Sequence, residues 1–217
     1  MNSEAQAGTA RFLHRPATPG KDGFLLTHGA GGNANASLLV ALANALSGMG
    51  FMVVRYNLPF RQERPFGPPR PASAARDRDG LKQEVELMRR EVGGRVFLGG
   101  HSYGGRQASM LCAEQNELAD GLLLLSYPLH PPGKPEQPRT KHFPDLKTPP
   151  LFVHGTHDPF GSIAEMESAM KLVPAKTKLL IVEKAGHDLG FKGKSKREEL
   201  PAAILEAFNK LINENQR

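Results

Sequence analysis

Three separated segments of the 217-residue sequence carry side chains that together could activate a hydroxyl nucleophile. Ser102 lies in the stretch GHSYGG, Asp158 in HGTHDPFG and His187 in AGHD. A serine hydroxyl is a weak nucleophile until a base removes its proton, and an acid must hold that base in the correct tautomer. The sequence therefore predicts Ser102 as the nucleophile, His187 as the general base and Asp158 as the acid that orients His187.

Other histidines and one other acid compete for these roles. His154 falls inside an apolar run and is expected to pack or to bond to backbone, while His157 lies in the loop of the acid. Asp188 follows the base directly, but a side chain adjacent in sequence rarely reaches the far ring nitrogen of its neighbour. We therefore expect Asp188 to cap its own loop. His28 and His101 are expected to be structural.

Short apolar runs bounded by glycine or proline recur along the chain and are typical of buried parallel strands. They span residues 24–26, 51–54, 96–98, 122–125, 151–153 and 179–182. Between most of them the apolar residues repeat with a helical period, as they do in 38–46, 81–92 and 163–173. Because crossovers between parallel strands are right-handed, the helices must cover both faces of the sheet. The sequence predicts a doubly wound α/β fold with a mostly parallel sheet and helices on both faces.

The carboxyl ends of such strands form the edge where ligands bind. HGAGG at 28–32, GHSYGG, HGTHDPFG and AGHD each follow a predicted strand, so they should meet at that edge. Gly100 and Gly104 permit the strained strand-to-helix turn that exposes a nucleophile. A tetrahedral intermediate also needs backbone N–H donors, and we predict that Ala30 and Tyr103 supply this oxyanion hole.

We predict a single domain over residues 1–217, in which 1–20 is an N-terminal segment. Two proline-rich loops, 57–79 and 127–150, are expected near the edge that carries the site. The second loop has little apolar periodicity, so no helical lid fits there.

Five residues in or near these loops are predicted to contact the substrate. Tyr127, His130 and Phe143 are expected to form walls of the pocket, because loops beside a rigid sheet edge often carry binding residues. Arg55 and Arg61, beside or inside the first loop, are expected to attract or orient an anionic substrate.

Composition disfavours several other classes of protein. The net charge is +6, but the basic residues form no nucleic-acid-reading element, so we expect no nucleic-acid partner. No apolar stretch approaches the roughly 20 residues that span a bilayer. The first ten residues lack the features of a signal peptide, so we expect a cytoplasmic protein without membrane association. The HGTHD string has too few clustered histidines for a zinc site, and we expect neither a metal nor another cofactor.

Residues 20–213 resemble the α/β-hydrolase superfamily, through HGAGG at 28–32, GHSYG at 100–104, HGTHDPFG at 154–161 and AGH at 185–187. The order serine, aspartate, histidine along the chain is the order of that superfamily. The sequence is similar to its compact dienelactone-hydrolase-like group. Within the group it resembles the branch with testis-expressed protein 30 and the third regulatory subunit of the non-specific lethal histone acetyltransferase complex. This resemblance implies a minimal, lidless hydrolase fold, although true dienelactone hydrolases have a cysteine where this chain has Ser102.

These observations predict a cofactor-independent serine hydrolase that cleaves a small-molecule carboxylic ester, thioester or lactone through an acyl-enzyme. Some members of the resembled branch are known better as components of complexes than as enzymes, so a non-catalytic interaction module that keeps the fold is the alternative. A peptidase or acyltransferase would use the same triad. The sequence is also compatible with a protein partner.

Overall fold

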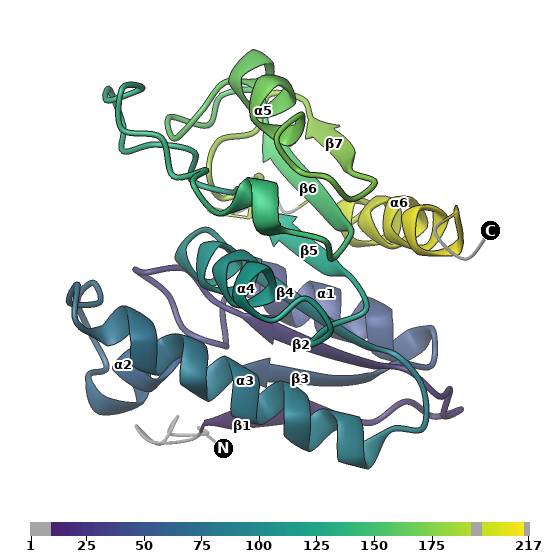
Figure 1. Cartoon of the computed structure of the whole chain (residues 1–217). Helices are drawn as coiled ribbons and strands as arrows, with labels where there is room; N and C mark the ends of the chain where they lie inside the picture. The colour runs from purple at the N-terminus through teal and green to yellow at the C-terminus, as the bar shows by residue number, and fades with distance from the viewer. Residues whose placement is uncertain (1–9, 192–196, 215–217) are drawn as a thin grey trace.

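The computed structural model describes residues 10–191 and 197–214, and within them seven strands form one sheet (Figure 1). The strands lie in the order β1-β3-β2-β4-β5-β6-β7. All neighbours are parallel except β1 and β3. The strands are β1 (Arg11–His14), β2 (Gly23–Thr27), β3 (Met52–Tyr56), β4 (Val96–His101), β5 (Leu122–Leu125), β6 (Pro150–Gly155) and β7 (Lys178–Val182).

Helices cover both faces of the sheet, as the sequence predicts. α1 (Ser37–Gly48) and α6 (Leu200–Glu214) pack on one face, and α2 (Pro59–Glu63), α3 (Ser73–Glu91), α4 (Tyr103–Glu114) and α5 (Ile163–Met170) contribute to the other. Figure 1 shows α3 and α4 in front of the sheet and α1 behind it. Each face has its own apolar core because successive strand residues point to opposite sides, as Leu25 and Leu26 do. The predicted doubly wound α/β fold is confirmed.

The predicted loop 57–79 is in part helical, which corrects the sequence prediction. It contains α2 and the first turns of α3. Pro59 occupies the start of α2, where proline needs no hydrogen-bonded N–H. The buried ring of Phe60 and the hydrogen bond from its N–H to the Asp77 carboxylate, 3.0 Å long, hold this short helix in place. The many prolines and arginines of this segment favoured a loop in the sequence analysis, but tertiary contacts stabilise a helix there.

Two other segments differ in detail from the prediction. The N-terminal segment 1–20 contributes β1, which pairs antiparallel with β3 and covers that edge of the sheet, while residues 1–9 lie outside the described residues. The segment 127–150 contains one 3₁₀ turn, η1 (Phe143–Asp145), and no helical insertion. In the described parts of the chain, no helix is long and apolar enough to cross a membrane.

Candidate active site

Ser102 lies on a sharp turn between β4 and α4. Its backbone angles are φ 51° and ψ −114°, a conformation that L-residues with a side chain rarely adopt. A Cβ atom at Gly100 would lie 2.5 Å from the Gly105 nitrogen, and one at Gly104 would lie 2.5 Å from the His28 carbonyl oxygen. The two predicted glycines therefore occupy positions where the turn brings backbone segments too close for any larger residue.

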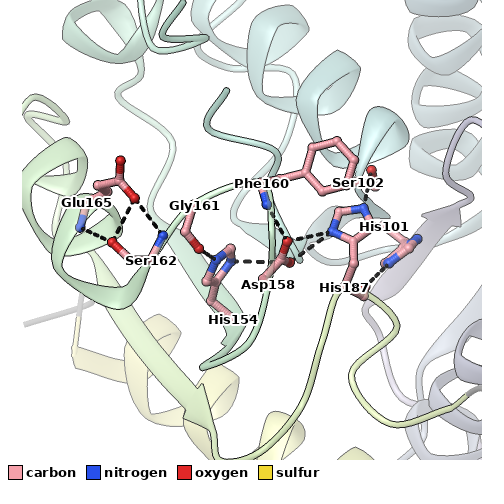
Figure 2. Close-up of polar contacts among 9 residues, drawn as sticks. All are labelled: His101, Ser102, His154, Asp158, Phe160, Gly161, Ser162, Glu165 and His187. Carbon is pink, nitrogen blue, oxygen red and sulfur yellow. Dashed lines mark hydrogen bonds and ion pairs between the residues drawn. The ribbon is translucent and has the colours of Figure 1, made fainter. Parts of the chain in front are cut away.

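The side chains of Ser102, His187 and Asp158 are in contact (Figure 2). The Ser102 Oγ lies 2.7 Å from His187 Nε2, and His187 Nδ1 lies 2.8 Å and 3.1 Å from the two Asp158 oxygens. Because Nδ1 faces a carboxylate, it carries the proton and donates it. Nε2 is then the acceptor for the serine hydroxyl, which is the tautomer that a general base requires.

The Asp158 side chain is fully buried, whereas His187 is partly open to solvent. Burial acts to raise the pKa of the Asp158 carboxyl, but the hydrogen bonds and charges of its neighbours outweigh burial and leave the pKa lowered. These neighbours are His187, the Phe160 N–H at 2.9 Å and the more distant His154. The Phe160 ring also lies against the imidazole of His187, with 4.3 Å between ring centroids. Asp158 is thus held as a carboxylate beside an imidazole whose plane is fixed by packing.

The competing residues make other contacts. The His154 Nε2–H donates to the Gly161 carbonyl at 2.8 Å behind Asp158, and His157 is exposed (Figure 2 shows His154). The Asp188 carboxylate accepts the N–H of Gly190 in its own loop, as expected of a capping residue. Within the described residues, no three His, Cys, Asp or Glu side chains gather in a way that could hold a metal ion.

His28 and His101 both support the site from behind. The His101 Nε2–H donates to the His187 carbonyl at 2.8 Å, which connects the loop of His187 to the residue before Ser102. The His28 Nδ1–H donates to the Gly29 carbonyl at 2.8 Å, and its Nε2 accepts the Leu58 N–H at 3.1 Å. One ring nitrogen of His28 donates and the other accepts, so this ring is neutral, and burial, with the charge of Arg61 adding to it, lowers its pKa to about 4.

The two predicted oxyanion donors come from separate segments, Ala30 from the loop between β2 and α1 and Tyr103 from the start of α4. Tyr103 is the first residue of α4, where an N–H has no carbonyl partner inside the helix. Ala30 follows Gly29, whose carbonyl accepts hydrogen bonds from His28 and from the Gly32 N–H. Because N–H and C=O point in opposite directions across a trans peptide, the Ala30 N–H points away from those two donors.

A cavity of about 400 Å³ opens beside Ser102 and His187. One side is formed by the glycine-rich segment 29–32 and the start of α1, and the other by the loops that follow β6 and β7. Its apolar walls come from Ala36, Leu38, Leu39, Phe160 and Phe191. Sequence reasoning missed these walls. Leu38 and Leu39 had the helical spacing of core residues, and they serve the core and the cavity together.

The predicted wall residues Tyr127, His130 and Phe143 do not line this cavity. Tyr127 and Phe143 are fully buried in the core on the α3 and α4 face, where the Tyr127 hydroxyl donates to the Arg139 carbonyl. His130 contacts the Pro131 carbonyl and lies 3.4 Å from the Glu165 carboxylate. The chain turns at Ser126, where φ is 47°, and the loop after β5 then packs over this other face of the sheet.

Arg55 and Arg61 are also not placed to bind a substrate. Both are more than nine-tenths buried, and neither lines the cavity. Arg55 donates to the Ala34 carbonyl, to the Asn35 side chain and to His14, while Arg61 donates to backbone carbonyls. Burial lowers the pKa of both guanidinium groups. Their donors serve the protein's own loops, which corrects the prediction of an anionic substrate held by these residues.

Comparison with known proteins identifies the family of this chain. Residues 20–214 match the model of the alpha/beta hydrolase domain. Among solved structures, the chain is similar to dienelactone hydrolase from Anabaena variabilis (20% identity, TM-score 0.73, covering 93% of this chain and 91% of that one). It is also similar to a serine hydrolase without a lid from Xanthomonas campestris (17%, 0.70, 92% and 88%) and to Est1E from Butyrivibrio proteoclasticus (16%, 0.73, 94% and 94%). At these identities the likeness to solved structures shows the fold, and the family match over almost the whole chain shows that the protein belongs to the alpha/beta hydrolase domain family.

Proposed function

We propose that this protein is a cofactor-independent serine hydrolase that cleaves a carboxylic ester, thioester or lactone through an acyl-enzyme. The observation that carries the proposal is the continuous contact from Ser102 Oγ through His187 to the buried Asp158, in which Ser102 and His187 line the cavity. A strained serine with its base and acid in hydrogen-bond range is the arrangement that nucleophilic catalysis requires.

The proposed reaction uses each group once in each half. His187 Nε2 takes the Ser102 proton while Oγ bonds to the substrate carbonyl carbon, and the carbonyl electron pair moves to the oxygen. That oxyanion accepts hydrogen bonds from the backbone N–H groups of Ala30 and Tyr103. When the intermediate collapses, the leaving alkoxide or thiolate takes the proton from His187. Water, deprotonated by His187, then attacks the acyl carbon. As this second intermediate collapses, His187 returns the proton to Ser102 Oγ and the carboxylic acid is released.

The walls of the cavity support a compact, largely apolar acyl or leaving group. Among its apolar walls, Leu38, Leu39 and Phe191 give surface against which such a group can pack. Est1E, which shares the fold, has been solved with bound ferulic acid. We base the narrower assignment to the dienelactone-hydrolase-like group on the four sequence motifs. The proposal also includes a small-molecule substrate and a location in the cytoplasm.

Labelling with a fluorophosphonate tests the proposal directly. Wild-type protein should be labelled and should hydrolyse a short p-nitrophenyl ester, whereas Ser102→Ala should do neither and should keep the wild-type circular dichroism spectrum. We expect a loss of about 10³-fold or more in kcat, because triad residues act as a unit. Folded wild-type protein that is never labelled would favour the alternative of a non-catalytic interaction module.

A substrate panel separates the closer alternatives. Ester, thioester, lactone and peptide substrates share the same acyl chemistry, and they differ in the leaving group that His187 must protonate. Preference for a peptide bond, or for an amine or alcohol acceptor over water, would identify a peptidase or an acyltransferase in place of a hydrolase of esters.

A further inference from the structure

The segment that carries Ala30 has little conformational preference of its own. We call residues 28–32, His-Gly-Ala-Gly-Gly, the oxyanion loop. Three of its five residues are glycine, and a Cβ atom at Gly31 would meet nothing within 4 Å. Glycine loses more backbone freedom on ordering than any other residue. A fixed direction for the Ala30 N–H must therefore come from contacts that hold this loop.

Arg61 provides several of those contacts from α2. Its Nη2 donates to the Ala30 carbonyl at 2.8 Å and its Nε donates to the Gly32 carbonyl at 2.8 Å. The same guanidinium donates to the Arg64 carbonyl at 3.1 Å and to the Gly67 carbonyl at 2.9 Å. One side chain thus joins the oxyanion loop to the segment that follows α2.

These bonds fix the backbone on one side of Ala30, and His28 fixes it on the other. His28 and the Gly32 N–H bind the Gly29 carbonyl, which sets the peptide plane that contains the Ala30 N–H. Arg61 binds the Ala30 carbonyl, which sets the next peptide plane. With both planes held, the backbone angles of Ala30 are determined, and so is the direction of its N–H.

Arg61 is itself held rigidly. Its guanidinium lies over the ring of Phe60, 4.9 Å from the centroid, and that ring packs edge-on against Tyr103 at 5.7 Å. The carboxylate of Asp77 accepts both the Phe60 N–H and, at 2.7 Å, the Tyr103 hydroxyl. The short helix α2 therefore contacts the residues of both candidate oxyanion donors.

A buried guanidinium bound only to carbonyls contributes little net stability, because its charge has been removed from water. Arg61 is 6% exposed, and the four hydrogen bonds described above are accepted by neutral carbonyl oxygens. Desolvation of the guanidinium charge offsets much of what such bonds contribute, so their number alone says little about the stability that Arg61 adds. What an apolar residue could not do is fix the direction of several peptide planes at once.

We propose that Arg61 is a positioning residue for catalysis, which holds the oxyanion loop so that the Ala30 N–H faces the developing oxyanion. This inference rests on the proposed function. It predicts that loss of Arg61 affects the transition state more than substrate binding, because the oxyanion forms only in the transition state.

The test compares Arg61→Gln and Arg61→Lys with a matched control, Arg95→Gln. The guanidinium of Arg95 also forms an ion pair, with Asp22 at 2.6 Å, and lies over an aromatic ring, that of Phe97. Arg95 precedes β4, however, whereas Ser102 follows it. Removing one oxyanion donor typically costs roughly 10²–10³ in kcat, so a loosened donor should cost about 10- to 100-fold. We expect that loss in Arg61→Gln, a smaller one in Arg61→Lys, and wild-type kcat in Arg95→Gln despite lower thermal stability.

Four further measurements separate positioning from stability. KM for a short ester should change by less than about three-fold, while affinity for a phenylboronic acid, whose bound form mimics the tetrahedral intermediate, should fall in parallel with kcat. Amide hydrogen exchange should become faster over residues 28–33 in Arg61→Gln. The pH dependence of kcat should be unchanged, because the contact between His187 and Asp158 is intact.

Each other outcome overturns the inference. Folded Arg61→Gln with wild-type kcat would do so, as would a loss seen in KM without one in kcat. If neither Arg61 variant folds, Arg61 is a stability residue. If wild-type protein neither hydrolyses esters nor reacts with the phosphonate, the proposed function fails, and the exchange measurement alone decides whether Arg61 holds the loop. Unchanged exchange over residues 28–33 would then refute the inference.

Discussion

Replacing Asp158 by asparagine tests the assignment of the acid, because it keeps the size of the side chain and changes its charge and its hydrogen bonding. The carboxylate accepts from the His187 Nδ1–H with both oxygens and from the Phe160 N–H with one of them. Asparagine has a single acceptor oxygen. If that oxygen stays with Phe160, the amide NH₂ faces Nδ1 and favours the His187 tautomer with the proton on Nε2, which cannot accept the serine proton. If the amide flips, two donors face each other at Phe160.

The size of the expected effect follows from this change of tautomer. In triads of this kind the same substitution costs roughly 10⁴ in kcat. We expect a loss of about 10³ to 10⁴ here, which corresponds to roughly 4–5.5 kcal/mol of transition-state stabilisation. The matched control is Asp188→Asn, because Asp188 lies next to the base and lines the same cavity, but its carboxylate caps its own loop. That control should lose less than about ten-fold.

Steady-state hydrolysis of a p-nitrophenyl ester, with thermal melting to confirm folding, measures both variants. The rate of phosphonate labelling should fall with kcat in Asp158→Asn, because it depends on the same activation of Ser102. A loss smaller than ten-fold in folded Asp158→Asn would refute the assignment, and so would an equal or larger loss in Asp188→Asn.

Three further predictions concern the turn, the buried histidine and the cavity. Gly104→Ala should lower the free energy of unfolding in urea by about 1–3 kcal/mol, because its Cβ would lie 2.5 Å from the His28 carbonyl, whereas Gly93→Ala, with nothing within 4 Å, should not. Since the folded chain keeps His28 neutral down to about pH 4 while the unfolded chain protonates it from about 6.5, stability should fall as the pH drops through this window, by about 3 kcal/mol from this group. Urea melts of wild type and His28→Asn at pH 7 and pH 4.5 measure this, and an equal pH dependence in both would contradict it. Hydrolysis should peak with short acyl chains and show no increase when the ester forms micelles, since no helical lid lies between β5 and β6; an activity maximum on long-chain esters would oppose this.

The contact among Ser102, Asp158 and His187 could be predicted from the sequence because it depends on rules that are local to each strand. Ser102, Asp158 and His187 each follow an apolar run, and parallel strands bring their carboxyl ends to one edge. Close packing at the turn likewise permits only glycine at Gly100 and Gly104, so the pattern is visible without coordinates. The fold class followed from the same alternation of apolar runs and helical periods.

The roles of the arginines and the cavity walls were decided by tertiary structure alone. Whether the loop after β5 turns toward the cavity or away from it depends on how it packs over α4, and this placed Tyr127 and Phe143 in the core. Arg61 donates to backbone carbonyls, which every residue possesses, so no sequence pattern marks its partners. Chain-local rules brought Ser102, Asp158 and His187 to one edge of the sheet, whereas long-range packing and backbone hydrogen bonds determined what surrounds them.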